Sequence, residues 1–211
     1  EKSTMYIPPA FATDDREQMR ALIRDHGFGL LITSSPTPIA SHLPLEWDSG
    51  DGGEGRLLGH VSAANMQWQA FEDDVDALAV FQGPHSYISP TWYKSENMVP
   101  TWNYGAVHAY GRPRILDEDA KHALLTRLVA HYEGNAPGDW NMDGLDADYV
   151  AAKMKGIVAF EMPIDRLEGK LKMSQNAKPE DALGAIDGLR ANGDAERARV
   201  ADVMARCNEG R

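Results

Sequence analysis

The spacing of apolar residues predicts helices near both ends of the chain and a series of strands between them. Apolar residues recur at i, i+3 and i+4 in the helical segments, whereas short apolar runs that end in turn-forming residues indicate strands. The expected helices are 14–26, 65–73, 118–134, 145–155, 180–191 and 194–206. The expected strands are 28–35, 39–47, 56–62, 77–83, 101–115 and a strand–bend–strand over 156–172.

Capping and turn residues set the expected ends of several elements. Thr13 is expected to cap the first helix, and Asp117 to cap the helix that stops at Gly134. The chain is expected to turn at Gly83 and then continue extended, with Pro90 confining that stretch to an edge or a bulge.

The order of the elements predicts the fold class. Strands do not alternate one for one with helices, so an α+β fold with an antiparallel barrel flanked by helices is favoured over a doubly wound parallel sheet. The length of 211 residues fits one domain, or one domain with a helical appendage. No apolar run approaches the ~18 residues of a membrane span, so no membrane partner is expected.

Charge and cysteine content restrict the partners and the compartment. Lys and Arg number 21 against 32 Asp and Glu, a formal net charge of -11, and neither half of the chain is basic. Direct DNA binding is therefore disfavoured, because it requires a face rich in Lys and Arg. The single cysteine, Cys207, excludes a disulfide framework, and the expected location is the reducing cytoplasm.

Two familiar kinds of site are not supported by the spacing of their residues. Gly50, Gly52 and Gly55 match the dinucleotide pattern, but they precede a strand instead of opening a helix, which indicates a hairpin loop. The seven histidines contain no H-x-x-x-H pair, so no metal site is expected. A single His is by default structural, although His42 and His60 lie mid-strand beside small polar residues.

Aromatic and polar residues are concentrated in the middle of the chain, where residues 57–93 contain no Lys or Arg. Three of the five tryptophans lie between positions 68 and 102. Two interpretations remain open: a core with a dimer face, or a pocket for a planar ligand with polar edges. Further on, Lys170 and Lys172 share one strand face beside polar residues and indicate either an anion site or a solvated strand end.

The segments GHVSAANMQW, FQGPHSYISPTWY, VPTWNYGAVHAYG and KMSQN, together with MYIPPAF and PIASHLPL, strongly resemble the PaiB family of FMN-binding negative transcriptional regulators. The resemblance runs in order from about residue 5 to residue 176. It implies a split-barrel FMN-binding domain over 5–176, with a C-terminal helical extension over 177–211 packed on it. It also implies a homodimer, with FMN bound at the dimer interface, and a role as flavin-dependent oxidoreductase or flavin-linked regulator.

The resemblance also implies which residues bind the flavin, although no catalytic residue follows from it. The cofactor-binding candidates are Ser41, His42, His60, Ser62, Asn65, Gln82, Ser89, Trp92, Trp102, Asn103, Lys172, Ser174, Gln175 and Asn176. The segment at 60–65 contains no cation, whereas split-barrel oxidases often have Arg and Lys there. The flavin phosphate would then be bound by backbone N–H groups, by Lys172, or by Arg112 and Arg114. A haem-binding protein and a non-enzymatic regulatory dimer are the alternatives.

Overall fold

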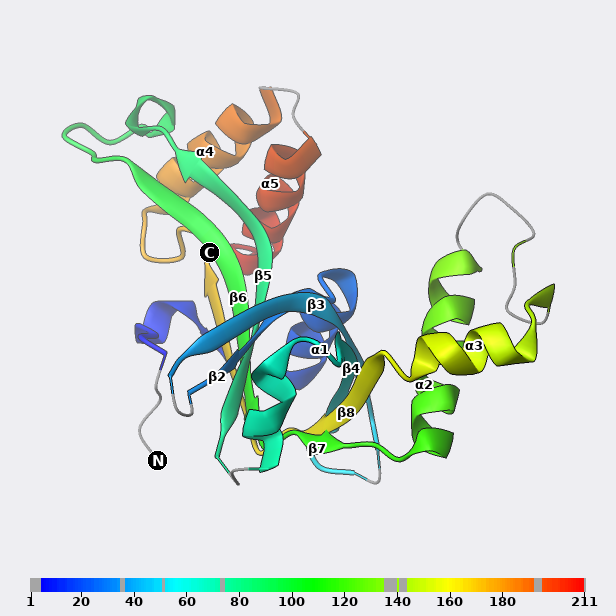
Figure 1. The fold of residues 1–211 in the computed structure, drawn as a ribbon. Coiled ribbons are helices and arrows are strands. Elements are labelled where there is room, and N and C mark those ends of the chain that lie inside the picture. Colours follow the sequence, from blue (N-terminus) through cyan, green and yellow to red (C-terminus); the bar gives the residue numbers. More distant parts are fainter. Residues whose placement is uncertain are drawn as a thin grey trace. The chain divides into compact units, whose positions relative to one another are not determined.

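The computed structural model describes residues 5–34, 37–50, 52–72, 75–134, 140, 144–191 and 195–210 (Figure 1). The chain divides into two compact units, each built from segments far apart in sequence. Unit 1 comprises Glu1–His26, Val80–His108 and Glu168–Arg211, and unit 2 comprises Gly27–Ala79 and Ala109–Leu167. The strand predicted at 28–35 and the helix predicted at 65–73 end, and the helix predicted at 194–206 begins, at residues that lie outside the described part of the chain.

Nine strands and eight helical segments make up the described part of the chain. The strands are β1 (Ala12–Thr13), β2 (Phe28–Thr33), β3 (Ile39–Asp48), β4 (Arg56–Ser62), β5 (Ala77–Ile88), β6 (Thr101–Gly111), β7 (Arg114–Ile115), β8 (Ile157–Pro163) and β9 (Arg166–Lys172). The α-helices are α1 (Arg16–Asp25), α2 (Glu118–Glu133), α3 (Ala147–Met154), α4 (Pro179–Ala191) and α5 (Ala195–Cys207). The short 3-10 helices are η1 (Pro9–Phe11), η2 (Met66–Glu72) and η3 (Pro90–Trp92).

Unit 1 combines strands in the order β1–β9–β6–β5 with three α-helices. β1 pairs with β9 antiparallel. Helices α4 and α5 pack on β5 and β9 through a buried apolar cluster whose members include Ile88, Leu171, Leu189 and Met204. The helices of the predicted C-terminal extension therefore share one core with these strands, while the boundary expected at residue 176 stays a prediction.

Unit 2 contains strands in the order β2–β3–β4–β8–β7, and the pairs resolved within it are antiparallel. Helix α2 covers one face through Leu124 and Leu128, which pack on Leu58 of β4 and Ala159 of β8. The sheet and the helices of the two units together confirm the predicted α+β class.

Three predicted boundaries were wrong. The strand expected over 101–115 ends at Gly111, and β7 pairs separately with β8. Thr13 does not cap the first helix: it belongs to β1, and the Asp15 carboxylate instead accepts the Gln18 N–H at 3.0 Å. β5 does not end at Gly83 but continues to Ile88. In β5 the buried residues are odd-numbered up to Gly83 and even-numbered from Ser86 onward. One alternating pattern therefore could not predict the whole strand from the sequence.

The hairpin reading of the glycine-rich loop is confirmed. β3 and β4 are antiparallel neighbours, with Asp48 opposite Arg56. Gly55 has a φ of +84°, and a Cβ there would lie 2.5 Å from the Asp48 carbonyl oxygen. The loop therefore needs glycine for its backbone and for this close approach.

Candidate functional site

The fourteen candidate residues divide between the two units. Unit 2 contains Ser41, His42, His60, Ser62 and Asn65. Unit 1 contains Gln82, Ser89, Trp92, Trp102, Asn103, Lys172, Ser174, Gln175 and Asn176. Each group is described within its own unit.

A hydroxyl–amide pair joins β3 to the turn after β4. The Asn65 side-chain amide donates to the Ser41 hydroxyl at 2.8 Å. The neighbouring Gln67 is fully buried and fixes this turn, because its amide donates to the Leu31 carbonyl at 3.0 Å and the Ile39 carbonyl at 3.1 Å. Ser41 and Asn65 are thus held in place by a polar residue that is not among the predicted site residues.

The other three candidates of unit 2 occupy the opposite face of the sheet. Glu46 of β3 lies opposite Leu58 of β4, so the even-numbered residues of both strands share one face. His42, His60 and Ser62 are on this face, which near Leu58 is covered by α2. One ligand lying flat on a single face would contact one of these two groups and not both.

His60 carries the polar atom in unit 2 that is best suited to an additional ligand. Its Nδ1 is buried and has no hydrogen-bond partner among the described residues. Burial lowers the pKa of His60 below its ordinary value, so the ring is neutral at pH 7. A neutral imidazole offers one donor and one acceptor nitrogen.

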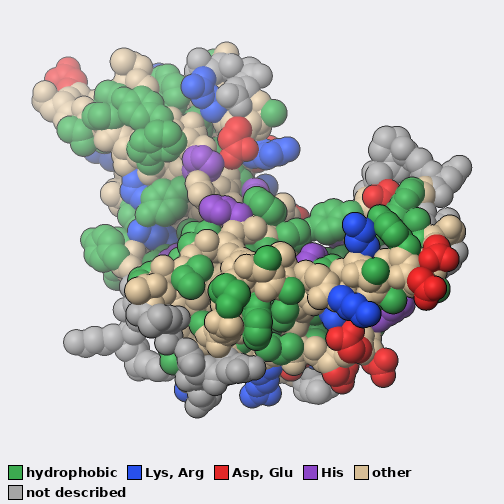
Figure 2. Space-filling model, viewed as in Figure 1, with side chains coloured by type: hydrophobic (Ala, Val, Ile, Leu, Met, Phe, Trp, Pro, Cys, Tyr) green, Lys and Arg blue, Asp and Glu red, His purple; other side chains and the backbone are tan. Residues whose placement is uncertain are grey.

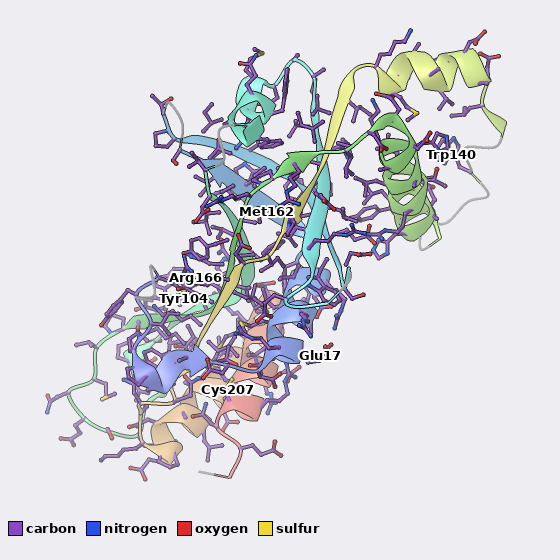
Figure 3. The ribbon with its side chains drawn as sticks, turned by 90° about the horizontal axis from the view of Figure 1, so that it is seen from below. Glu17, Tyr104, Trp140, Met162, Arg166 and Cys207 are labelled. Carbon is purple, nitrogen blue, oxygen red and sulfur yellow. The ribbon has the colours of Figure 1, made fainter. Side chains whose placement is uncertain are left out.

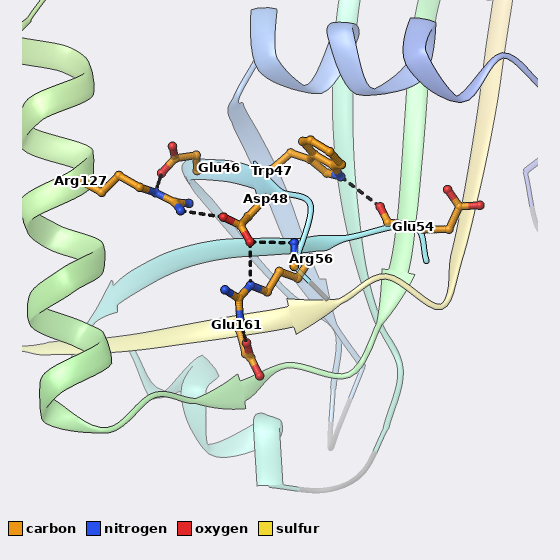
Figure 4. A network of polar contacts seen from close by, with 8 residues as sticks. Glu46, Trp47, Asp48, Glu54, Arg56, Arg127 and Glu161 are labelled. Carbon is orange, nitrogen blue, oxygen red and sulfur yellow. Dashed lines mark hydrogen bonds and ion pairs between the residues drawn. The ribbon is translucent and has the colours of Figure 1, made fainter. Parts of the chain in front are cut away.

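Two arginines of unit 2 are bound by carboxylates in one network (Figure 4). Arg127 donates to Glu46 at 2.9 Å and to Asp48 at 2.7 Å. Arg56 donates to Asp48 at 3.0 Å and to Glu161 at 2.8 Å. An anion held by the unit 2 candidates would therefore rely on neutral donors.

The arginines expected as alternative phosphate ligands have different environments. The Arg112 Nε lies 3.0 Å from Asp76, and both side chains are largely exposed. Arg114 is exposed in the two-residue strand β7. Acidic and basic side chains are intermingled over α2 and α3 in Figure 2, so this face of unit 2 has no uniformly basic surface.

Lys172 is the principal cation among the unit 1 candidates. Its ammonium donates to the Thr101 hydroxyl and to the Trp102 carbonyl. Burial, and then the nearby charge of Lys170, lower the pKa of Lys172. Lys170 lies on the same strand face, and its ammonium donates to the Tyr6 carbonyl at 2.9 Å. Two neighbouring cations on one partly buried face favour a bound negative charge.

An exposed aromatic group lies on β5 and β6. Trp102 is 54% exposed, and its ring stacks on His85 with centroids 6.3 Å apart, while Tyr87 meets it edge-on at 6.2 Å. Gln82 adds a polar contact, because its amide nitrogen lies 3.2 Å from His85 Nδ1. His85 and Tyr87 were absent from the predicted set, although their i, i+2 spacing on β5 was the signal that could have added them.

Asn103 and Ser174 form a buried pair on the other face of β6. Asn103 is 1% exposed and donates to the Ser174 hydroxyl at 2.9 Å. Ser174 has a φ of +65°, so this bond holds a backbone conformation that is uncommon outside glycine. Gln175 closes the same turn by accepting the Met173 N–H at 2.7 Å.

The remaining three candidates of unit 1 are not brought together. The Ser89 hydroxyl caps η3 by accepting the Thr91 N–H at 3.3 Å. Trp92 packs against α4, where its ring lies over Gly188. Asn176 is exposed. These contacts give Ser89 and Trp92 evident structural roles.

Comparison with known proteins identifies the family. Residues 5–166 match the family model described as "Putative FMN-binding domain". The chain belongs to this FMN-binding family. A curated relative, "Protease synthase and sporulation protein PAI 2" of Bacillus subtilis, is 35% identical over 201 residues, which cover 95% of this chain and 96% of the relative. The PaiB resemblance is thereby confirmed, and FMN is the cofactor that this family binds.

Two solved structures share the fold of this FMN-binding family member. The flavocytochrome Anf3 of Azotobacter vinelandii is 17% identical with a TM-score of 0.56, over 76% of this chain and 69% of that one. The FAD- and haem-binding protein of Mycobacterium smegmatis is 15% identical with a TM-score of 0.54, over 76% and 73%. Both likenesses support the predicted split-barrel fold.

The candidate residues fit FMN by the chemistry of their donors. FMN presents acceptor atoms along its ring edge, ribityl chain and phosphate. Unit 1 offers the Lys172 ammonium, and unit 2 offers either the Ser41–Asn65 pair on one sheet face or, on the other face, the His60 Nδ1, which has no hydrogen-bond partner among the described residues. Trp102 adds an exposed aromatic surface. Within the described residues, no group of three or more His, Cys, Asp or Glu is placed to hold a metal, and no helix is long and apolar enough to cross a bilayer.

Proposed function

We propose that this protein is an FMN-dependent oxidoreductase that works as a cytoplasmic homodimer. When bound, FMN supplies the electron and hydride transfer, and the protein supplies binding, orientation and electrostatics. The observation that carries the proposal is Lys172, a partly buried ammonium beside a second lysine.

Lys172 is suited to stabilising negative charge on the cofactor. Its lowered pKa means that the charged ammonium is disfavoured by its surroundings in the cofactor-free chain. A cofactor anion placed against it would relieve that penalty and restore the pKa. The Thr101 hydroxyl and the Trp102 carbonyl fix the position of the ammonium.

The test is a visible spectrum of protein loaded with excess FMN and then desalted, followed by anaerobic titration with NADPH. Retained flavin that bleaches with NADPH supports the oxidoreductase. Lys172→Met is expected to weaken FMN binding about tenfold or more, because a charge-assisted bond is lost. Lys178→Met is the matched control, since the Lys178 side chain is 69% exposed and outside the candidate set. Flavin that does not bleach, with NADH or NADPH, would contradict the proposal.

A flavin-linked regulator is the second candidate, and the printed name of the Bacillus subtilis relative favours it, since it refers to protease synthesis and sporulation. The net charge of -11 argues that such regulation would act through another protein and not by direct contact with DNA. Retained flavin that is indifferent to nicotinamide reductants, together with altered secreted-protease levels on deletion, would support this candidate over the enzyme.

The homodimer proposal rests on the exposed aromatic group of Trp102, Tyr87 and His85. Large aromatic residues on a surface are enriched at interfaces and at ligand pockets. Light scattering of the purified chain tests it: a dimer that Trp102→Ala converts to monomer supports the proposal, and a monomeric wild-type chain contradicts it.

Haem is the alternative ligand, because two of the solved structures with this fold are named as a flavocytochrome and a FAD- and haem-binding protein. Haemin titration separates the ligands. A Soret shift that His60→Gln or His42→Gln abolishes would support haem, and its absence in the wild-type chain would remove this alternative.

A further inference from the structure

A cavity of about 690 Å³ lies within unit 1, between α1, α5 and the strands β5, β6 and β9. None of the fourteen candidate flavin residues lines it. Its volume falls in the range of ~300–1,000 Å³ that is typical of small-molecule sites. The cavity is therefore separate from the candidate flavin residues and large enough for a ligand of its own.

Helix α1 borders the cavity with one continuous stripe of side chains. Gln18, Ala21, Leu22, Asp25 and His26 line it and are spaced i, i+3, i+4, i+7 and i+8. Residues with this spacing on an amphipathic helix normally pack against a neighbouring element. In α1 a different pair, Met19 and Ile23, enters the core, so the cavity-lining stripe is a second face.

Helix α5 borders the cavity with a stripe of the same spacing. Arg199, Asp202, Val203, Arg206 and Cys207 line it, next to the buried face formed by Val200, Ala201 and Met204. In Figure 3, Cys207 marks the end of α5 near α1, the helix that carries Glu17. Two helices thus present corresponding, mainly polar stripes to one space.

The floor of the cavity is apolar and closely packed. Leu171 and Met173 line it from the end of β9, and Gly105 lines it from β6. A Cβ at Gly105 would lie 3.1 Å from Leu171 and 3.2 Å from Leu22, so this glycine lets the side chains approach the sheet closely. A ligand here would meet hydrocarbon below and charged groups at the rim.

The rim carries two carboxylates, Asp25 and Asp202, and two guanidinium groups, Arg199 and Arg206, so an anionic group is favoured only beside Arg206. Asp202 is paired with Arg190 at 3.1 Å, and Arg199 lies 3.5 Å from Glu196. Arg206 forms no ion pair with any of the described acidic residues, and its guanidinium can bind a carboxylate through two parallel hydrogen bonds.

We propose that this cavity binds an amphipathic organic acid, with its carboxylate on Arg206 and its hydrocarbon part on Leu22, Met173 and Val203. The apolar floor accounts for the hydrocarbon, and the Arg206 guanidinium, which is paired with no acidic residue of the described part of the chain, accounts for the carboxylate. The proposal is independent of the proposed flavin chemistry, because no residue is shared between the two sites.

Cys207 provides a direct reporter of occupancy. It is the only cysteine of the chain, it lines the cavity, and its thiol is half-buried. Burial raises the pKa of this thiol, so alkylation with iodoacetamide is best followed at mildly alkaline pH by intact mass. A ligand in the cavity would slow alkylation of this one residue.

The experiment uses the FMN-loaded protein with decanoate and decanol as probes, and measures the Cys207 alkylation rate together with calorimetric binding. Decanoate is expected to slow alkylation without changing the flavin absorbance. Arg206→Gln is expected to weaken decanoate binding about tenfold, which is the scale of one charge-assisted bond, and to leave decanol unchanged. Arg197→Gln, on the same helix but outside the lining, is the control and is expected to behave as wild type.

Three outcomes would overturn the proposal. Equal decanoate affinity in Arg206→Gln and wild type would exclude the carboxylate contact. No calorimetric binding and no protection of Cys207 in the wild type would exclude the site itself. Displacement of FMN by decanoate would show that the acid binds at the flavin site and not in this cavity.

Discussion

Asp181 holds Ser95 through two bonds: the Ser95 backbone N–H donates to Oδ1 and its hydroxyl donates to Oδ2, each at 2.8 Å. The Lys94 N–H adds a third bond at 2.7 Å. Asp181 lies in the first turn of α4 and is buried. One carboxylate therefore ties the segment after η3 to this helix.

Asp181→Asn is expected to lower the unfolding midpoint and to expose the segment around Ser95 to protease, because the amide replaces a charged acceptor of three bonds. The bonds, the Ser95 N–H foremost, lower the pKa of Asp181. The stabilisation is therefore present above the ordinary Asp pKa of ~3.9 and is lost as pH falls through the lower folded-state value. Unfolding by urea across acidic pH measures this, with the exposed Asp187→Asn as control. Identical acid profiles for both variants would refute the assignment.

Two glycines of α4 make room for Trp92. A Cβ at Gly188 would lie 2.4 Å from the Trp92 ring, and a Cβ at Gly184 would lie 2.1 Å from the Trp92 carbonyl oxygen. Gly188→Ala and Gly184→Ala are each expected to destabilise the protein by about 1–3 kcal/mol, the usual cost of overpacking. Denaturant unfolding measures both.

A second substitution separates the two clashes. Trp92→Leu is expected to recover part of the loss in Gly188→Ala, because the clash there is with the ring. It is expected to recover nothing in Gly184→Ala, where the clash is with backbone. Additive effects in the Gly188→Ala, Trp92→Leu double variant would contradict this contact.

Periodicity was sufficient to predict most of the elements. The helix expected at 180–191 is α4 (Pro179–Ala191), and the strand expected at 56–62 is β4. The misplaced helix cap shows the limit of local pattern reading. Thr13 and Asp15 are both good N-caps, and only the pairing of β1 with β9 decides between them, because it commits Thr13 to a strand.

Candidate site residues were harder to predict, because a motif does not say which side of a strand a residue occupies. Trp102 and Asn103 are adjacent in sequence, yet one is exposed and the other is buried against Ser174. Family resemblance supplied the list of residues. Gln67, which fixes the turn that carries Asn65, acts through long-range hydrogen bonds that no spacing in the sequence indicates.

Arg127 joins α2 to β3 through Glu46 and Asp48. Its side chain is 39% exposed, so screening by solvent limits the value of these ion pairs. Arg127→Met is expected to cost about 1 kcal/mol of unfolding free energy, and less at high salt. A double-mutant cycle with Asp48→Asn measures the coupling. A loss above ~3 kcal/mol would instead indicate a fully desolvated pair.

The lowered pKa of His60 makes the free energy of unfolding depend on pH in a higher pH range than the range in which the carboxylates titrate. Burial disfavours the protonated ring in the folded chain, whereas the unfolded chain protonates His at its ordinary pKa of ~6.5. The unfolded state therefore binds more protons between these two values, and stability falls as pH is lowered through that window. Asp181 adds to the pH dependence only below ~3.9, where its stabilisation is lost.

His60→Gln is expected to flatten the stability profile just below pH ~6.5, because glutamine does not titrate. His122→Gln, an exposed position on α2, is expected to keep the wild-type slope. Urea unfolding at a series of pH values measures both. A wild-type profile that is already flat in this window would mean that the folded chain protonates His60 as readily as the unfolded one. The buried Nδ1 would then be stabilised in its charged form, and its role as a neutral donor or acceptor toward FMN would be withdrawn.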